Sequence, residues 1–324
     1  MRISRAGIFV LIAFTVLAGT GCSRIIARKD LVDGAKAYKD RKYDKAEELF
    51  RDAISRDQSQ DTAQLFLART LHSQYAADRT KTEKAVEAIA QYKKTIEEYK
   101  QKVQNSPLIM SGDVSPCNYS DDEIRRMPPD KKPAFDAFKI LGDSYKAVAN
   151  LLDNLQKTDE RIAWLNQWGA DESLPGCLRA EPYTSLASKE NTCANDITEI
   201  PEVKKTVTKD GKSAFSFVKP EKPEDLELLK GCIQRGSDLI NKAAELNPNS
   251  DSIWSYKTSL LIQNMRLAEM EARTEDKDKF KAESDKAKER FMELAKTKKE
   301  KTDAEEARRK AEEEQESGKK EEKK

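Results

Sequence analysis

A short stretch near the N-terminus, residues 34–53, constrains the fold of this chain more than any other. Its sequence is GAKAYKDRKYDKAEELFRDA. Ala46, Phe50 and Ala53 recur at i, i+4 and i+7, a spacing that places all three on one face of a helix. Gly34 lies in a helical pattern before a polar turn, so the stretch predicts two antiparallel helices. Small residues let such helices approach closely, and Phe50 fills the space towards a neighbouring hairpin.

This pattern resembles the tetratricopeptide repeat, a helical hairpin of about 34 residues with a small residue in each helix and aromatic residues beside the turn. The matching positions are Gly34, Tyr43, Ala46, Phe50 and Ala53. Gln58 stands where the family has proline. The resemblance implies an all-α solenoid of stacked hairpins. It also implies that the concave face, lined by the first helix of each repeat, binds a protein partner.

Hairpin patterns continue along the chain. Residues 28–105 carry repeats one and two, residues 134–175 carry repeat three, and residues 224–295 carry C-terminal helices of the same kind. Repeat three is the clearest, and its first helix contains Phe138, Leu141, Gly142 and Tyr145. The segment after residue 224 is interpreted as the second helix of a fourth unit, whose first helix is displaced or replaced.

Two stretches interrupt this array and are predicted to be irregular insertions. They cover residues 106–133 and 176–223, and proline and glycine punctuate both. In the first, Ser120 and Glu123 form a capping box for a single short helix. In the second, an Asp-Gly pair at 210–211 lies between apolar runs, which indicates a β-hairpin.

The first 21 residues have the composition of a signal peptide. Two arginines precede an uncharged apolar run and then small residues before Cys22. This order is typical of a secretory signal rather than of a membrane-spanning helix. It resembles the lipobox of bacterial lipoproteins, which implies cleavage after residue 21 and acylation of Cys22. An ordinary secretory peptide with an incidental cysteine and an uncleaved anchor are the alternatives.

The residues after the proposed cleavage site carry further expectations. Residues 22–27 are predicted to be a linker between the lipid anchor and the first repeat. Ser23 follows the cysteine and resembles the sorting pattern for outer-membrane delivery in Gram-negative bacteria. The predicted location is therefore the cell envelope, at the outer membrane and facing the periplasm.

Charge argues against a nucleic-acid partner. Lys and Arg number 59 and Asp and Glu number 58, so the formal net charge is only +1. No arginine-rich patch interleaved with aromatic residues is present. Lys, Glu, Asp, Arg and Ala dominate residues 296–324 and no apolar stripe is present, so this tail is expected to be a fraying helix or disordered.

The sequence offers no catalytic motif. His72 is the only histidine, so a Ser/His/Asp arrangement or a histidine-rich metal site could not form without it. The chain has no phosphate-binding loop, no dinucleotide fingerprint and no Cys-x-x-Cys motif. We therefore expect no enzymatic activity, no cofactor, no metal and no small-molecule substrate.

Four cysteines remain after Cys22, an even number that suits disulfides outside the cytoplasm. Cys117 precedes the first helix of repeat three and Cys177 follows its second helix, so antiparallel packing brings the two to the same edge. This favours a Cys117–Cys177 bridge and leaves Cys193 with Cys232. Free buried thiols, or a bridge between Cys177 and its neighbour Cys193, are equally compatible alternatives.

The resemblance implies partner-binding positions on the first helix of each repeat. They are Tyr38, Arg69, His72, Lys139, Asp143 and Lys146. Mixed charge with one aromatic suits a protein segment held by ion pairs and a hydrophobic anchor, although any solvated helix face shows such residues.

The predicted function is a non-catalytic protein interaction scaffold in the envelope, anchored by lipid. The alternative is a lipoprotein that binds a ligand or polysaccharide, with the two insertions as a lid. Tyr183, Phe215 and Phe217 in the second insertion are its candidates for stacking on sugars, against a core role for the same residues.

Overall fold

The structure is a computed structural model that describes residues 23–321 apart from 60, 112–114 and 210. The predicted signal peptide and Cys22 lie outside the described residues. The described chain is helical except for one β-hairpin, which confirms the all-α fold class. No helix in the described part is long and apolar enough to cross a membrane.

The chain divides into two compact units. The first unit comprises the described residues up to Met110 together with Pro129–Arg161. The second unit comprises Ser111–Pro128 and the chain from Ile162 onward. The division falls inside a helix of the predicted third repeat, so that repeat is shared between the two units.

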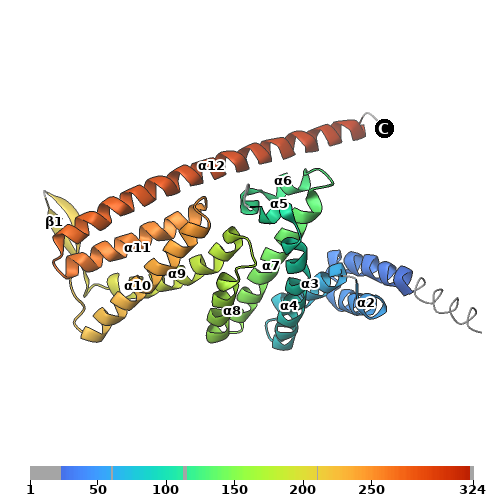
Figure 1. Ribbon diagram of the computed structural model, residues 1–324, viewed down its shortest axis with the longest axis horizontal. Coiled ribbons are helices and arrows are strands. Elements are labelled where there is room, and N and C mark those ends of the chain that lie inside the picture. The colour runs from blue at the N-terminus through green and yellow to red at the C-terminus, as the bar shows by residue number, and fades with distance from the viewer. Residues whose placement is uncertain (1–22, 60, 112–114, 210, 322–324) are drawn as a thin grey trace, which may run out of the picture. The chain divides into compact units, whose positions relative to one another are not determined.

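The first unit stacks antiparallel helices in chain order (Figure 1). A helix over residues 23–39 precedes the labelled ones, and the others are α2 (Tyr43–Arg56), α3 (Asp61–Ala77), α4 (Thr82–Gln104), α5 (Pro107–Met110) and α7 (Lys132–Asn154). In this unit α2 packs on α3, α3 on α4, and α4 on α7. The hairpins predicted for repeats one and two are therefore present, and α4 has the extended length that its periodicity indicates.

Gly34 and Phe50 close the first hairpin, as their spacing predicts. A Cβ atom added at Gly34 would lie 2.7 Å from Phe50 Cε1, so only glycine fits without a shift of the ring. Phe50 is fully buried, and its ring stacks on that of Phe66 in α3 with centroids 5.5 Å apart. The aromatic ring thus joins the first hairpin to the next.

Residues 23–27, which belong to the segment predicted as a lipid-anchor linker, are helical. Ala27 is fully buried. Ser23 Oγ donates a hydrogen bond to the carbonyl oxygen of Arg56 at 2.8 Å, and Arg24 lies 4.0 Å from the Asp57 carboxylate. These contacts join the described start of this helix to the end of α2.

The second unit contains helices and the only sheet of the described chain. Its elements are the 3-10 helix η1 (Pro116–Asn118), α6 (Asp121–Arg125), most of α8 (Thr158–Ala170), α9 (Gly176–Thr198), β1 (Lys204–Lys209), β2 (Lys212–Phe217), α10 (Pro223–Leu246), α11 (Asp251–Met270) and α12 (Thr274–Glu321). The principal contacts join α9 to α10, α10 to α11, and α11 to α12.

The second insertion differs from its prediction, because its first half is the helix α9. This helix has 23 residues, and Ala180, Ala187 and Ala194 are fully or almost fully buried. Alanines give a weak apolar periodicity, and Pro182 inside the helix resembles a helix breaker, so the sequence pattern concealed it. The helix supplies the partner that α10 lacked in the sequence interpretation.

Close packing explains the small residues of this region. A Cβ atom added at Gly236 of α10 would lie 2.6 Å from Leu260 Cδ2 and 3.2 Å from Glu190 Cβ. The three helices α9, α10 and α11 therefore meet at a point where only glycine fits. The apolar stripe expected for α10 is buried, at Leu229, Cys232, Ile233, Ile240 and Ala243.

Both predicted local motifs of the insertions are present. Strands β1 and β2 pair antiparallel, with Lys204 opposite Phe217 and Lys209 opposite Lys212. The Ser120 side chain accepts a hydrogen bond from the Glu123 backbone N–H, and the Glu123 carboxylate accepts one from the Ser120 backbone N–H, which completes the capping box of α6. The first insertion also contains α5 and η1, so its single predicted helix was an incomplete description.

Both disulfides lie in the second unit. Cys117 pairs with Cys177 with Cα atoms 6.2 Å apart, and Cys193 pairs with Cys232 with Cα atoms 6.1 Å apart. This is the pairing that the position of repeat three favours. The first bridge ties η1 to α9, and the second ties α9 to α10.

The charged tail continues α12 as far as Glu321. Of the two forms expected from the sequence, helix or disorder, the described part of the tail is therefore helical. It forms ion pairs with the capped turn of α6. Lys301 lies 2.6 Å from Glu123, Arg308 2.9 Å from Asp122, and Glu312 2.8 Å from Arg126. Charge pairs, rather than apolar burial, connect this helix to the first insertion.

Candidate functional site

Residues predicted to bind a partner lie in three helices of the first unit. Tyr38 is in the helix over 23–39, Arg69 and His72 are in α3, and the others are in α7. The structure groups them with two residues that the prediction did not include, and we call the set the partner face: Tyr38, Phe66, Arg69, His72, Tyr92, Lys139, Asp143 and Lys146.

Aromatic contacts form one end of the partner face. The rings of Tyr38 and Phe66 meet edge to face with centroids 6.1 Å apart. The Tyr38 hydroxyl and Ser73 Oγ share a hydrogen bond at 3.2 Å. The Arg69 guanidinium lies over the Phe66 ring, 6.0 Å from its centroid, which is at the outer limit of a cation–π contact. Tyr38, Phe66 and Arg69 are half-buried, so they combine a fixed position with access to solvent.

Tyr92 of α4 lies beneath this surface and links the helices. Its side chain is 4% exposed. Burial raises the pKa of the Tyr92 phenol, Tyr38 and Asp143 add to the rise, and the Arg69 charge opposes it. Groups from the first helix, from α3 and from α7 are therefore all close enough to Tyr92 to influence its charge. The phenol stays neutral at physiological pH and serves as a buried hydrogen-bonding group.

His72 contacts Tyr92 directly. Its Nδ1 atom lies 3.4 Å from the Tyr92 hydroxyl, and the two rings are perpendicular with centroids 6.0 Å apart. Burial lowers the pKa of the His72 imidazole, and the charge of Arg79 lowers it further. A neutral imidazole suits this position, since it can exchange hydrogen bonds with a phenol but adds no buried charge.

Charged residues of α7 form the other end of the partner face. Lys139 Nζ lies 3.6 Å from Asp143 Oδ2, and their side chains are 40% and 44% exposed. Lys146 is exposed and lies seven residues after Lys139, on the same side of the helix. An exposed ion pair of this kind contributes little to stability, so its charges are available to a charged partner at small cost.

Phe66 and Tyr92 are the members that sequence reasoning missed. Tyr92 is buried in the second helix of repeat two, where an aromatic side chain is expected to pack, and its hydroxyl also reaches His72. A tyrosine at a packing position was the available signal, because a buried hydroxyl usually requires a polar partner. Phe66 precedes Arg69 by three residues, so the two share a helix face.

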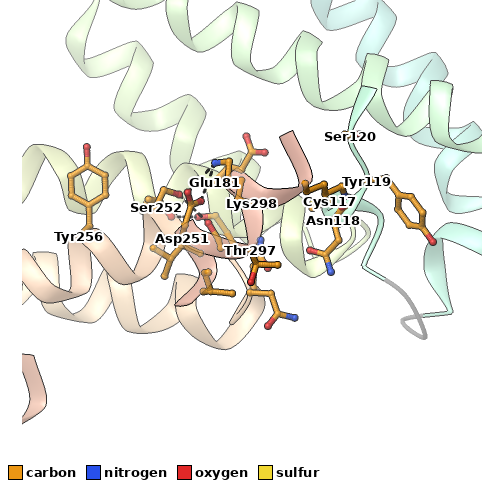
Figure 2. Close-up of a pocket in the computed structure, with 18 of the residues that line it drawn as sticks. Cys117, Asn118, Tyr119, Ser120, Glu181, Asp251, Ser252, Tyr256, Thr297 and Lys298 are labelled. Carbon is orange, nitrogen blue, oxygen red and sulfur yellow. Dashed lines mark hydrogen bonds and ion pairs between the residues drawn. The ribbon is translucent and has the colours of Figure 1, made fainter. Parts of the chain in front are cut away.

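A second candidate site is a cavity of about 930 Å³ in the second unit (Figure 2). Its walls come from η1 and the residues after it, from α9, from the start of α11, and from α12. Lys298 bridges to Asp251 at 3.0 Å, and Ser120 Oγ donates to Glu305 at 2.5 Å. Apolar groups make up somewhat more than half of the lining surface and hydroxyl, amide and carboxylate groups supply the rest, which suits a ligand with polar groups and an apolar face.

The aromatic residues proposed to stack on sugars do not form a common surface. Tyr183 and Phe217 are each 8% exposed and pack in the cores of the second unit, whereas Phe215 is 60% exposed. The core role is therefore correct for the first two. Among the described residues, no group of three or more His, Cys, Asp or Glu side chains is placed to hold a metal ion.

Comparison with known proteins does not add a family. No family model and no curated protein matches this sequence. Among solved structures, the chain is similar to one titled "TPR2AB-domain:pHSP90-complex of yeast Sti1". The match has 14% identity and a TM-score of 0.22, and it covers 83% of this chain and 96% of that one. A score this low carries no argument about fold or partners, so the account depends on the packing described above.

Proposed function

We propose that this chain is a non-catalytic interaction scaffold of the bacterial cell envelope, which binds a segment of a protein partner on the partner face. The observation that carries the proposal is a cluster in which Tyr38 and Arg69 contact the Phe66 ring and His72 contacts the buried Tyr92. Three helices that are far apart in sequence contribute to it. Exposed helix faces with no binding role would not require their side chains to contact one another across helices.

The chemistry of the partner face defines the segment it would bind. Half-buried Tyr38 and Phe66 provide an apolar platform, and Arg69, Lys139 and Lys146 provide positive charge beside the single carboxylate of Asp143. This combination suits a segment with one apolar or aromatic anchor and acidic neighbours. Nucleic acid is not part of the proposal, because the overall charge is balanced.

The lipid anchor is the second part of the proposal. Its support is the apolar run followed by small residues and Cys22. Several acyl chains on Cys22 would hold the protein stably at a membrane, where one chain would bind only marginally. The proposed location is the periplasmic side of the outer membrane. Labelling with a clickable palmitate tests it: the wild type should be labelled and Cys22→Ser should remain an unlabelled precursor, and equal labelling of both would refute the anchor.

Affinity purification from crosslinked envelopes tests the partner face. The wild type should recover a partner, and Arg69→Glu combined with Lys139→Glu should lose it. The matched control is Lys45→Glu combined with Lys94→Glu, which reverses two exposed lysines of α2 and α4 outside the partner face. Recovery of the bait alone under several crosslinkers, or equal loss in both double variants, would contradict the proposal.

The cavity of the second unit supports a second candidate function, binding of a polar ligand such as a saccharide. Thermal-shift and glycan-array screening tests it, since a ligand that binds the folded state raises its melting temperature. Thr184→Leu and Thr297→Leu would narrow the cavity and remove polar groups from its wall, so each should reduce any such shift. A shift that persists undiminished in both variants would place the ligand elsewhere.

A further inference from the structure

The outer side of the first helix carries a continuous row of exposed residues. We call it the basic stripe: Ile25, Arg28, Lys29, Val32, Lys36 and Lys39. Successive members are separated by one, three or four residues, so at about 100° per residue they fall on one face. All six are exposed, whereas Ala27 and Gly34 on the opposite face are buried against the rest of the unit.

The cations of the basic stripe are not paired with acidic side chains of the described chain. Within the described residues, Arg28, Lys29, Lys36 and Lys39 form no ion pair, although the chain as a whole has 59 basic and 58 acidic residues. Asp30 lies on the inner side of the helix and pairs with Arg56 at 2.9 Å. Four cations therefore point outward without internal compensation.

Apolar side chains accompany these cations. Ile25 is 72% exposed and Val32 is 61% exposed, and they lie seven residues apart on the same face. A helix that presents lysine and arginine together with aliphatic residues on its outer face is suited to the interface of a bilayer. There the aliphatic groups enter the headgroup region and the cations meet lipid phosphates.

The start of the helix strengthens this interpretation. Residue 23, which follows Cys22 directly in the sequence, already belongs to the described part of this helix. If Cys22 carries acyl chains, the end of this helix is held at the membrane surface. The stripe extends over 14 residue steps, about 21 Å along the helix axis at the usual rise per residue.

We propose that the basic stripe docks this protein on the surface of a bilayer that contains anionic phospholipid, and so orients the first unit beside its lipid anchor. The orientation rests on the proposed acylation of Cys22. The affinity of the stripe for anionic lipid does not, because it follows from the exposed charges and aliphatic groups themselves.

Vesicle co-sedimentation tests the proposal without the anchor. The chain from residue 22 onward, with Cys22→Ser, is mixed with phosphatidylcholine vesicles with and without phosphatidylglycerol. We expect binding only when phosphatidylglycerol is present, weakened by added salt. Lys29→Gln combined with Lys36→Gln should lower the partition coefficient roughly 30-fold, because each cation near an anionic surface contributes about a factor of five.

Matched variants make the result decisive. Lys45→Gln combined with Lys94→Gln removes the same charge from α2 and α4 and should leave binding unchanged. Ile25→Ser combined with Val32→Ser should reduce the binding that remains at high salt, and circular dichroism checks that each variant is folded. Equal binding to both vesicle types, or equal loss in the two lysine pairs, would overturn the proposal. Neither outcome would affect the palmitate test of Cys22.

Discussion

The two units of this protein are stabilised in different ways. The first unit has no cysteine among its described residues, and its hairpins are joined by close packing such as that of Gly34, Phe50 and Phe66. The second unit contains both disulfides and the ion pairs between α12 and α6. Both disulfides lie where the insertions interrupt the array, and the ion pairs there connect α12 to the first insertion.

The difference shows what an interrupted repeat array requires. Helical repeats draw stability from contacts with their immediate neighbours, so an uninterrupted stack needs only complementary packing. The insertions add loops whose closure costs conformational entropy, and a crosslink removes part of that entropy from the unfolded chain. The first unit should therefore respond to changes in packing and the second to reduction.

The largest expected effect is that of Phe50→Ala on the first unit. Removing a fully buried phenylalanine between two hairpins should lower the free energy of unfolding of this unit by about 3–5 kcal/mol. Hydrogen exchange of α2 and α3 amides measures it. Phe215→Ala removes an exposed ring and serves as the control.

Tryptophan fluorescence sharpens this test. The three tryptophans, Trp164, Trp168 and Trp254, all belong to the second unit. In Phe50→Ala, the urea transition followed by tryptophan fluorescence should have the same midpoint as in the wild type. A transition that moves together with the exchange of α2 would show that the units unfold as one, and the comparison would fail.

Loss of a disulfide should destabilise the second unit and leave the first unit unchanged. The Cys117–Cys177 bridge closes a loop of 60 residues, which contributes about 4 kcal/mol in the chain-entropy model. Cys117→Ser combined with Cys177→Ser should shift the tryptophan transition to lower urea and make residues 111–223 protease-sensitive. Helices α2 and α3 should stay protected from the protease. Four alkylated thiols in protein isolated from the periplasm without reductant would mean that no bridge exists there.

A smaller effect is expected from alanine at two helical glycines. Gly34→Ala places a Cβ atom against the Phe50 ring and should destabilise the first unit by about 1–2 kcal/mol, after the gain in helix propensity is subtracted. Gly231→Ala meets only the flexible end of Arg235, so it should stabilise α10 by up to about 1 kcal/mol. Urea titration of both variants measures the sign of the change in the free energy of unfolding for each. Equal effects would show that the packing at Gly34 is not tight.

The smallest effect concerns Glu47, which connects α2 to its neighbours. Burial alone would raise the pKa of this carboxyl, but hydrogen bonds from Lys84, Arg51 and Gln74 outweigh burial and hold the pKa below its ordinary value. A carboxyl whose pKa is lower in the folded state adds stability above its unfolded pKa of 4.5, and this is lost as the pH falls through the folded pKa.

Glu47→Gln should therefore cost about 1 kcal/mol at neutral pH and progressively less in acid below the unfolded pKa. Urea titration followed by hydrogen exchange at several pH values measures it. A cost that does not change with pH would mean that the side chain acts through its shape and not through its charge.

The sequence predicted the first unit better than the second for a physical reason. Gly34, Ala46 and Phe50 lie within one hairpin, so their spacing encodes their contact. Helix α9 was missed because it buries alanines against α10, and alanine carries little apolar signal. The pairing of Lys301 with Glu123 joins residues 178 positions apart in a charged tail, and nothing local in the sequence encodes it.

The candidate site was predicted in part for the same reason. The resemblance placed Tyr38, Arg69 and Asp143 on the first helices of their repeats, and each of them influences the pKa of one neighbouring group, the buried phenol of Tyr92. That neighbour, Tyr92, belongs to a second helix, so a rule that considers one helix face at a time could not include it. Its role depends on how α3, α4 and α7 pack together.

Site-specific photo-crosslinking in the native envelope tests the central claim most directly. A photoreactive amino acid replaces Arg69 or Asp143 on the partner face, or Lys45 or Lys94 outside it. The account predicts that the first two positions crosslink to the same protein partner, and that the peptide captured contains acidic residues around an apolar or aromatic anchor. Crosslinks that form equally well from Lys45 and Lys94, or none from Arg69 and Asp143 while the other positions capture a partner, would contradict it.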